Sequence, residues 1–186
     1  SCDETAVCLI EASGNFDQSF TFEVLGNALI SQTAVHAPYG GVFPNLAKRE
    51  HARNLVPLLA QVLNFKEPAV QGVPLDKIRE ILTREPELYD QLVPFLAAHQ
   101  RPVIDAIAVT HGPGLEPALW VGVNFAKALS AAWEIPIVPV NHLEGHIAMA
   151  AMAEGKLATF DFPAIALLIS GGHTELDLVK KWPEFE

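Results

Sequence analysis

Cysteine and long apolar runs are both scarce in this sequence, and each scarcity argues against a class of protein. The two cysteines are Cys2 and Cys8. With strand-like sequence between them, they would lie on one face about 20 Å apart, too far for a disulfide. No apolar run approaches the roughly 18 residues of a membrane-spanning helix, and the first residues lack a signal peptide's basic flank. We therefore expect a reducing compartment rather than a membrane or secreted protein.

Basic residues are also few. Twelve Lys and Arg stand against 22 Asp and Glu, which gives a formal net charge of −10. Tight binding of a nucleic-acid backbone depends on clustered Lys and Arg. We therefore do not expect this chain to bind nucleic acid tightly by itself. A more basic partner could still present a nucleic acid as substrate. Half of the 186 residues are hydrophobic, enough for one generous domain, or for one lobe with part of another.

The order of the predicted elements favours an α/β architecture. Strands are predicted at 5–11, 20–33 with a break at 26–27, 103–110, 135–140, 164–170 and 174–180. Helices are predicted at 45–64 with Asn45 as N-cap, at 66–101 with Pro86 and Pro94 dividing or kinking it, at 118–133, and from 141 to about 154. The chain has no initiator Met, starts inside a strand and turn, and stops soon after its last hairpin begins. We therefore expect an internal piece of a longer protein.

Two histidines open the last of these helices, in the segment Asn141-His-Leu-Glu-Gly-His146. If Asn141 is the N-cap, His142 and His146 lie about 40° apart around the helix axis and one turn along it. That spacing suits two ligands of one metal ion. Glu144 lies about 200° from His142, where its carboxylate can return to the N-cap amide, and Leu143 stands where a zinc protease has its glutamate. Histidines that only pack or face solvent are the alternative.

A glycine turn and an acidic turn are two further candidate sites. The segment Leu168-Ile-Ser-Gly-Gly-His-Thr174 places two glycines between strands. Free backbone N–H groups there can cradle a phosphate, and a plain hairpin turn is the alternative. The segment Ser1-Cys-Asp-Glu-Thr5 is an acidic turn beside a strand. It could bind a metal–phosphate group or a ribose, or it could simply be solvated.

The loop and helix from His36 to His51 form the fourth candidate. Lys48 and Arg49 could meet an anion, and His51 lies on the apolar stripe of the predicted helix. A hydrogen-bonded core histidine and two ordinary surface charges account for the same residues without any ligand. The sequence leaves this choice open.

These four segments follow one another along nearly the whole chain, and one more, Gly112-Pro-Gly-Leu115, belongs with them. They are Ser1-Cys-Asp-Glu-Thr5, His36-Ala-Pro-Tyr-Gly-Gly-Val-Phe-Pro44 with Ala47, Arg49 and His51, Gly112-Pro-Gly-Leu115, Asn141-His-Leu-Glu-Gly-His146, and Leu168-Ile-Ser-Gly-Gly-His-Thr174. In this order they closely resemble the tRNA threonylcarbamoyladenosine transferase family, TsaD, formerly called O-sialoglycoprotein endopeptidase. Five family segments in sequence are a far more specific signal than one histidine pair.

The resemblance implies an actin/hexokinase-like α/β fold with two ribonuclease-H-type lobes that close on a nucleotide. Residues 1–158 would be the N-terminal lobe, without its first strand and with a helical insertion at about 66–101. Residues 159–186 would be the truncated start of the second lobe. The implied reaction transfers a threonylcarbamoyl group from threonylcarbamoyl-AMP to the exocyclic amine of adenosine 37 in tRNAs that read ANN codons. This piece alone would be inactive, whereas its parent protein would be active.

The resemblance also implies roles for individual residues. His142 and His146 would bind one divalent metal ion, iron or zinc, and the third ligand, an Asp of the C-terminal lobe, would lie outside this chain. The intermediate's binding site would be lined by Leu168, Ile169, Ser170, Gly171 and Gly172. Asp3 and Glu4, in the family's first acidic turn, would be the catalytic carboxylates.

Partners and rival functions follow from the same resemblance. The family acts in a multi-protein complex, so tRNA would be held together with TsaB-like and TsaE-like subunits, in the cytoplasm and away from membranes. A non-catalytic TsaB-like subunit of the same fold is one alternative, although such relatives lack the histidine pair. A metalloprotease is a second alternative, disfavoured by the missing His-Glu-x-x-His order. A small-molecule kinase of the same fold is a third alternative, disfavoured because phosphoryl transfer does not usually need a histidine pair.

Overall fold

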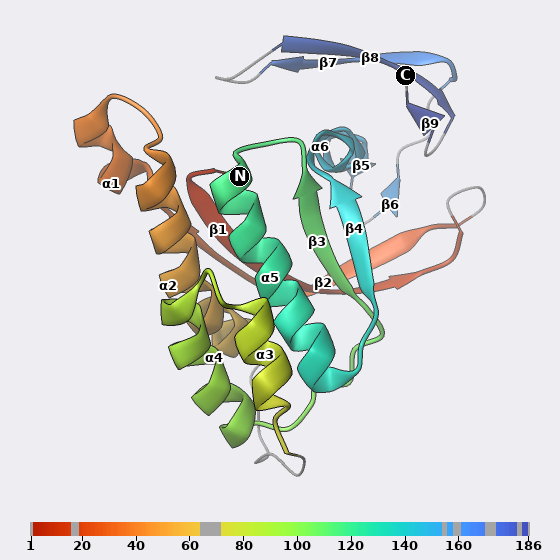
Figure 1. Cartoon of the computed structure of the whole chain (residues 1–186). Coiled ribbons are helices and arrows are strands. Elements are labelled where there is room, and N and C mark those ends of the chain that lie inside the picture. The colour runs from red at the N-terminus through yellow and green to blue at the C-terminus, as the bar shows by residue number, and fades with distance from the viewer. Residues whose placement is uncertain are drawn as a thin grey trace. The chain divides into compact units, whose positions relative to one another are not determined.

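Strands and helices alternate along the chain after an opening pair of strands, which confirms the predicted α/β class (Figure 1). The computed structural model describes residues 2–15, 19–63, 72–153, 156–157, 161–169, 174–181 and 184–185. The chain divides into two compact units, Ser1–Leu9 with Gly26–Val140, and Ile10–Leu25 with Asn141–Glu186. Strands β1 (Glu4–Ser13) and β2 (Thr21–Ser31) contribute residues to both units. Each unit is therefore described separately.

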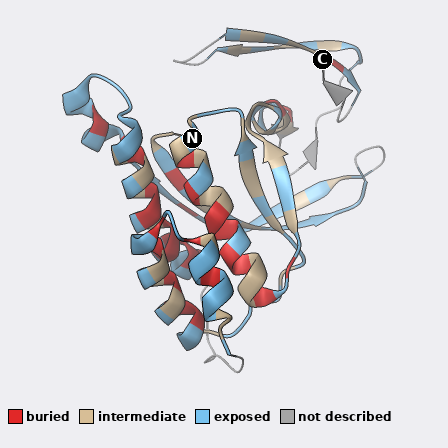
Figure 2. Cartoon of the chain, in the orientation of Figure 1, coloured by how far each residue is buried: buried red, intermediate tan, exposed pale blue. Residues whose placement is uncertain are grey.

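A layer of packed helices forms the core of the first unit. It consists of α2 (Pro44–Leu63), α3 (Leu75–Ile81), α4 (Pro86–Ala98) and α5 (Glu116–Trp133). Helix α2 packs against α4 and α5, and α3 packs against α5. Figure 2 shows their buried stripes turned toward one another. The least exposed side chains of this core come from all these helices, and they include Leu58, Ile78, Leu82, Leu88, Leu92 and Val121.

A strand–helix–strand unit lies beside these helices. Strands β3 (Ile107–Gly112) and β4 (Ile137–Asn141) form a two-stranded sheet, and Figure 1 shows them pointing the same way. Helix α5 is the crossover between them, and it packs against β3. Two short elements, α1 (Thr33–His36) and the 3-10 helix η1 (Ala37–Tyr39), join β2 to α2.

A buried carboxylate ties three helical segments of this unit together. Glu85 directly precedes α4, and only 1% of its side chain is exposed. Its Oε1 lies 3.4 Å from the ammonium of Lys48 on α2. Its Oε2 accepts a 2.9 Å hydrogen bond from the Asn124 amide on α5. Lys48 also donates to the Arg84 carbonyl at 3.0 Å, so one polar cluster fixes α2 to α5 and to the α3–α4 connection.

The structure differs from the sequence-based expectation at two prolines. Helix α2 begins at Pro44, so the prediction of Asn45 as N-cap was wrong. Proline suits a first helical position because the N–H that it lacks would have no intrahelical partner there. Pro86 does open a new helix, as predicted, but Pro94 lies inside an uninterrupted α4. Burial of Phe95 and Leu96 next to it offsets the hydrogen bond that Pro94 cannot make.

Strand boundaries also differ from the prediction. Strand β2 runs through Gly26 without the predicted break. A Cβ at Gly26 would lie 3.0 Å from the Val62 carbonyl oxygen and 3.2 Å from Val62 Cγ1, so the glycine permits β2 to approach α2 closely. Strand β3 starts at Ile107, and Val103, expected in a buried strand, is fully exposed.

The second unit holds one helix and a set of strands. Helix α6 (His142–Ala150) ends before the predicted Glu154, and β5 (Met152–Ala153) and β6 (Lys156–Leu157) follow. The first sheet has the order β1-β2-β6-β5, with Thr21 of β2 opposite Lys156 of β6. Strands β7 (Ala164–Ile169) and β8 (Thr174–Lys181) pair antiparallel, as predicted, and β9 (Glu184–Phe185) extends the sheet.

Two of the expected absences can be examined in the structure. Cys2 and Cys8 are both free thiols, as the strand spacing predicts. Within the part of the chain that the structure describes, no helix combines the length and the apolar character needed to cross a bilayer.

Candidate functional site

The first turn of α6 begins at the predicted N-cap, but the capping role predicted for Glu144 is not observed. Asn141 is the N-cap, and its side-chain oxygen accepts from the backbone N–H groups of Leu143 at 2.9 Å and Glu144 at 3.4 Å. These bonds satisfy two donors that a helix start otherwise leaves unpaired. The Glu144 side chain is exposed, and among the described residues no hydrogen bond returns from its carboxylate to Asn141. Asn141 alone therefore fixes the helix start that carries the two histidines.

The structure brings the imidazoles of His142 and His146 together on one face of α6. Their Nε2 atoms are 3.3 Å apart, and their rings meet edge to face with centroids 4.5 Å apart. His142 is half-buried and His146 is exposed. Two nitrogens at about 2.0–2.1 Å from a tetrahedral ion are separated by about 3.3–3.4 Å, so this spacing fits two ligands of one metal ion.

The histidine pair has no third ligand close by in the described part of the chain. There, no group of three or more His, Cys, Asp or Glu side chains is arranged to hold a metal ion. Leu143 occupies the place of the zinc-protease glutamate, and Glu144 is exposed. Two imidazoles alone bind an ion weakly, so a ligand from elsewhere would be needed for a tight site.

The glycine-turn segment is described only in part. Leu168 and Ile169 end strand β7, opposite Glu175 and Thr174 of β8. Leu168 is half-buried, and Ile169 is 75% exposed. The other predicted substrate-binding residues, Ser170, Gly171 and Gly172, lie outside the described residues. Helix α6 packs against β7, so the histidine helix and the strand that leads into this segment are neighbours in the second unit.

The acidic turn belongs to the first unit. Asp3 is half-buried, and Glu4 is exposed at the start of β1. The backbone carbonyl of Asp3 accepts a 2.6 Å hydrogen bond from Gln32 N–H, which holds the turn against the end of β2. The Cys2 thiol lies 3.7 Å from Asp3 Oδ1, and burial and the Asp3 carboxylate both raise the pKa of Cys2. The catalytic roles of Asp3 and Glu4 stay predictions.

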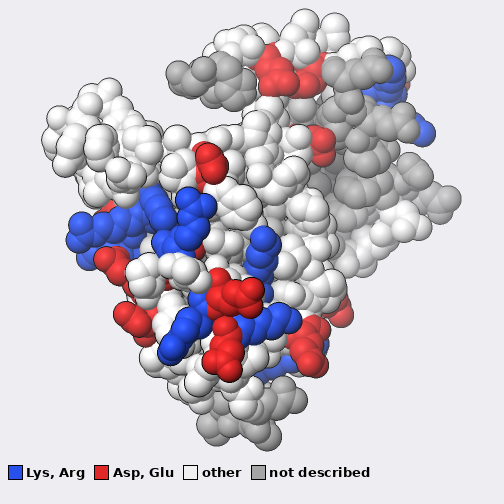
Figure 3. Space-filling model, viewed as in Figure 1, with Lys and Arg blue, Asp and Glu red and all other residues white. Residues whose placement is uncertain are grey.

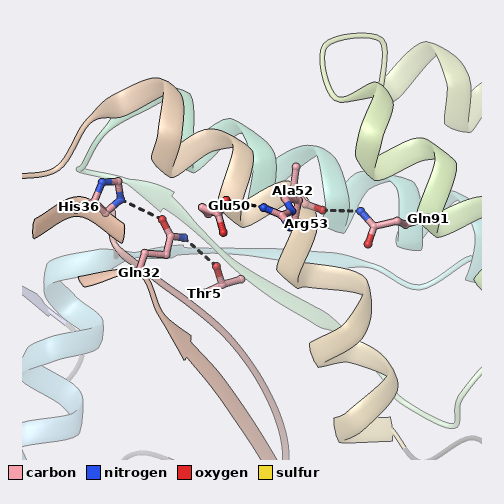
Figure 4. Close-up of polar contacts among 7 residues, drawn as sticks. All are labelled: Thr5, Gln32, His36, Glu50, Ala52, Arg53 and Gln91. Atoms are coloured by element: carbon pink, nitrogen blue, oxygen red, sulfur yellow. Dashed lines mark hydrogen bonds and ion pairs between the residues drawn. The ribbon is translucent and has the colours of Figure 1, made fainter. Parts of the chain in front are cut away.

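A buried network of side-chain hydrogen bonds includes Thr5, the last residue of this segment. The sequence analysis identified only part of the network. Phe43 N–H donates to His36 Nδ1 at 3.3 Å, so the proton of neutral His36 is on Nε2. His36 Nε2 then donates to Gln32 Oε1 at 3.2 Å, and Gln32 Nε2 donates to Thr5 Oγ1 at 3.2 Å (Figure 4). Thr5 Oγ1 lies 2.7 Å from His51 Nδ1, and Gln32 Nε2 lies 3.3 Å from the same nitrogen. One hydrogen-bonded network therefore joins the loop before α2 to Thr5 and His51.

This network settles part of the choice left open for His51. The side chain is 6% exposed and bonded through Nδ1, as expected of a core histidine. Its Nε2, however, is buried without a hydrogen-bond partner. Gln32 was missed because a glutamine at the end of an exposed strand carries no sequence signal; its 1% exposure results from tertiary packing alone.

Acid is expected to destabilise the protein through His51. Burial lowers the pKa of His51 below its ordinary value of 6.5. Below pH 6.5 the unfolded chain therefore binds a proton that the folded protein does not, and stability falls as the pH drops from 6.5 toward the folded pKa. The loss in that window is at most about 1.4 kcal/mol per pH unit. Denaturant unfolding at pH 7.5 and 5.5 should show a smaller loss in His51→Gln than in the unaltered protein.

The matched control is His111→Gln, since His111 is exposed at the end of β3. This variant should keep the full pH dependence. Equal losses in the unaltered protein and in His51→Gln would contradict a neutral, buried His51.

Comparisons with known proteins agree with the order of the motifs. The sequence profile of TsaD, tRNA N6-adenosine threonylcarbamoyltransferase, matches residues 23–81 and 96–186. A protein of that name from Koribacter versatilis is 40% identical over 183 residues, covering 97% of this chain and 38% of the relative. The one from Thermomicrobium roseum is 39% identical, covering 97% and 40%, and the one from Staphylococcus carnosus is 35% identical, covering 100% and 42%.

The chain thus spans about two fifths of the length of these curated relatives. The match extends over both compact units, and it includes the loop before α2, the histidine pair of α6 and the strands β7 and β8. Because the profile covers well over half of the chain, this protein belongs to the TsaD family, the tRNA N6-adenosine threonylcarbamoyltransferases.

Proposed function

We propose that the complete gene product transfers a threonylcarbamoyl group from threonylcarbamoyl-AMP to the exocyclic amine of adenosine 37 in tRNAs that read ANN codons. The observation that carries the proposal is the family match over residues 23–81 and 96–186, with the histidine pair inside it. The 186 residues by themselves would be inactive, since they span about two fifths of the relatives' length.

His142 and His146 are proposed to hold one divalent metal ion, iron or zinc. The 3.3 Å separation of their Nε2 atoms supports this assignment. A carboxylate ligand from outside the chain would complete the set. An ion with open positions would polarise the threonylcarbamoyl carbonyl toward attack. The Asn141 cap fixes the helix start that carries both histidines, and the His142 side chain is half-buried there.

The other site residues are proposed to bind the adenylate and to move the proton. Leu168, Ile169, Ser170, Gly171 and Gly172 would line the adenylate site, with glycine-turn amides on its phosphate. The amine nitrogen of the adenosine forms a bond to the carbonyl carbon, the bond to the AMP oxygen breaks, and AMP departs. The amine also loses a proton, and Asp3 and Glu4 are the carboxylates that we assign to accept it.

The fold and the setting of the reaction are part of the same proposal. The chain would form an actin/hexokinase-like N-terminal lobe over residues 1–158, with an insertion at about 66–101 and the start of the second lobe at 159–186. With a net charge of −10, it would depend on TsaB-like and TsaE-like subunits to hold tRNA in the cytoplasm.

Mass spectrometry of nucleosides tests the function directly. The complete gene product, its partner subunits, threonylcarbamoyl-AMP and an unmodified ANN-decoding tRNA should yield threonylcarbamoyl-adenosine. The same tRNA with guanosine at position 37 is the control and should yield none. Failure to form the product with correctly folded protein would contradict the transferase and favour a non-catalytic, TsaB-like subunit. Cleavage of casein that depends on His142 would favour the metalloprotease instead.

A further inference from the structure

Two aromatic rings lie stacked on the surface of the segment that leads into α2. Tyr39 is 61% exposed and Phe43 is 47% exposed. Their ring centroids are 5.4 Å apart and their planes differ by 22°, so each ring stacks on the other and both remain accessible to solvent. Val35 and Val42 of the same segment are also exposed. We call residues 33–43 the aromatic projection.

The backbone holds the aromatic projection in a defined shape. Gly40 has a positive φ of 71°, which lets the chain turn back between the two rings. No atom lies within 4 Å of the position that a Cβ would take at Gly40 or Gly41, so the turn is open on its outer side. Beneath it, the buried His36 accepts from Phe43 N–H and donates to Gln32. The ring pair is thus preorganised by the buried network.

A patch of positive charge adjoins the aromatic projection. Figure 3 shows Lys and Arg gathered over α2, next to an uncharged surface at α1. We define the patch as the three basic residues of α2, Lys48, Arg49 and Arg53, together with Arg84, whose backbone carbonyl accepts from Lys48. Arg49 and Arg84 are exposed, and the salt bridges among the described residues involve only the other two. Arg49 follows Phe43 by six residues, which is about 9 Å along the helix.

We propose that the aromatic projection and these two arginines form a contact surface for single-stranded RNA, on which an unstacked base lies against Tyr39 or Phe43 while Arg49 and Arg84 bind its phosphates. This inference rests on the proposed transfer to a tRNA adenosine, and it adds to that function the place where the RNA loop is held. Base–aromatic stacking beside cationic groups is the usual way in which proteins hold single-stranded RNA. The guanidinium group binds phosphate in two-point geometry.

Local charge decides between RNA and a protein partner. The chain as a whole carries −10, but at physiological salt a charge acts over about 8 Å, so distant acidic residues contribute little to the field at the exposed Arg49 and Arg84. Two arginines without acidic partners would be costly to cover with an apolar protein surface. An RNA loop supplies both a base for the aromatic pair and phosphate anions for the arginines.

Fluorescence anisotropy with the complete gene product, assembled with its TsaB-like and TsaE-like subunits, and a labelled anticodon stem-loop RNA tests the aromatic pair. Tyr39→Ala/Phe43→Ala should weaken binding about 10-fold and leave its salt dependence unchanged. Tyr39→Phe/Phe43→Tyr keeps both rings and should bind as the unaltered protein does. In the transfer assay, the alanine variant should raise KM for tRNA at unchanged kcat. Equal RNA binding by the two variants, or no RNA binding by the unaltered protein, would overturn the proposal.

The salt dependence of RNA binding tests the two arginines separately. Arg49→Ala/Arg84→Ala should reduce the slope of log affinity against log salt by about 1.4, since each phosphate contact on a single strand contributes about 0.7. Lys77→Ala removes an exposed charge of α3 outside the patch and should change neither slope nor affinity. If the variants change RNA binding as expected but the nucleoside assay yields no modified adenosine, the RNA contact surface is supported and the proposed function is contradicted. If the alanine variant binds RNA normally but no longer retains a partner subunit, the pair docks a protein and the RNA assignment is wrong.

Discussion

The complete gene product carrying His142→Ala and His146→Ala is expected to lose about one iron or zinc ion per chain and to transfer threonylcarbamoyl about 1,000-fold more slowly. The physical reason is the 3.3 Å separation of the two Nε2 atoms, which suits shared coordination. The Asn141 cap remains in the variant because its partners are backbone N–H groups. Elemental analysis of the purified proteins and the nucleoside assay measure the two effects.

The fold of the variant should be unaffected, since His146 is exposed and the helix keeps its cap. His111→Ala removes an exposed histidine of β3 and should retain metal and activity. Equal metal content in the double variant and in the unaltered protein would contradict a metal role. The edge-to-face contact of the two rings would then be a packing feature of the helix start.

Removal of the Lys48 charge is expected to cause the largest loss of stability, about 2–3 kcal/mol. Lys48→Met leaves the Glu85 carboxylate 1% exposed with Asn124 as its remaining side-chain partner. An unpaired buried charge costs about 3–5 kcal/mol, and the value here is lower because 32% of the Lys48 side chain is exposed and water can reach the site. Denaturant unfolding at neutral pH measures the effect.

Two further variants separate the cost of a lost partner from the strength of the pair. Lys48→Met/Glu85→Leu removes both charges and should recover most of the lost stability. Arg53→Met breaks the pair with Glu50 on the surface of α2 and should cost less than about 0.5 kcal/mol. If Lys48→Met is as mild as Arg53→Met, the buried cluster does not fix α2 to α5.

The elements with a strong periodic pattern and a local end signal were predictable from the sequence. Helix α5 has its apolar residues at helical spacing, and the observed Glu116–Trp133 differs from the predicted 118–133 by two residues. Asn141 was identified as a cap because the cap bond is local. The break at Gly26 was wrong because its true role, close approach to Val62 on α2, depends on a contact between distant segments.

In the candidate site, too, features set by neighbouring residues were predictable, whereas contacts between distant segments were not. The juxtaposition of His142 and His146 follows from helix geometry alone, so the sequence sufficed. The network of Thr5, Gln32, His36 and His51 joins residues up to 46 positions apart. No local pattern marks it, because the strand β2 that carries Gln32 at its end is mostly exposed. A ligand supplied from outside the chain cannot be inferred from spacing at all.

The sharing of β1 and β2 between the two compact units limits how this protein can be dissected. The chain passes between the units at residues 9–10, 25–26 and 140–141. A piece ending at Val140 would keep β1 and β2 in full but lose β6, with which β2 pairs. A piece beginning at Asn141 would lack β2 altogether. Either truncation leaves a bare strand edge, which is a template for aggregation, so cutting the chain at one crossing does not yield two self-contained pieces.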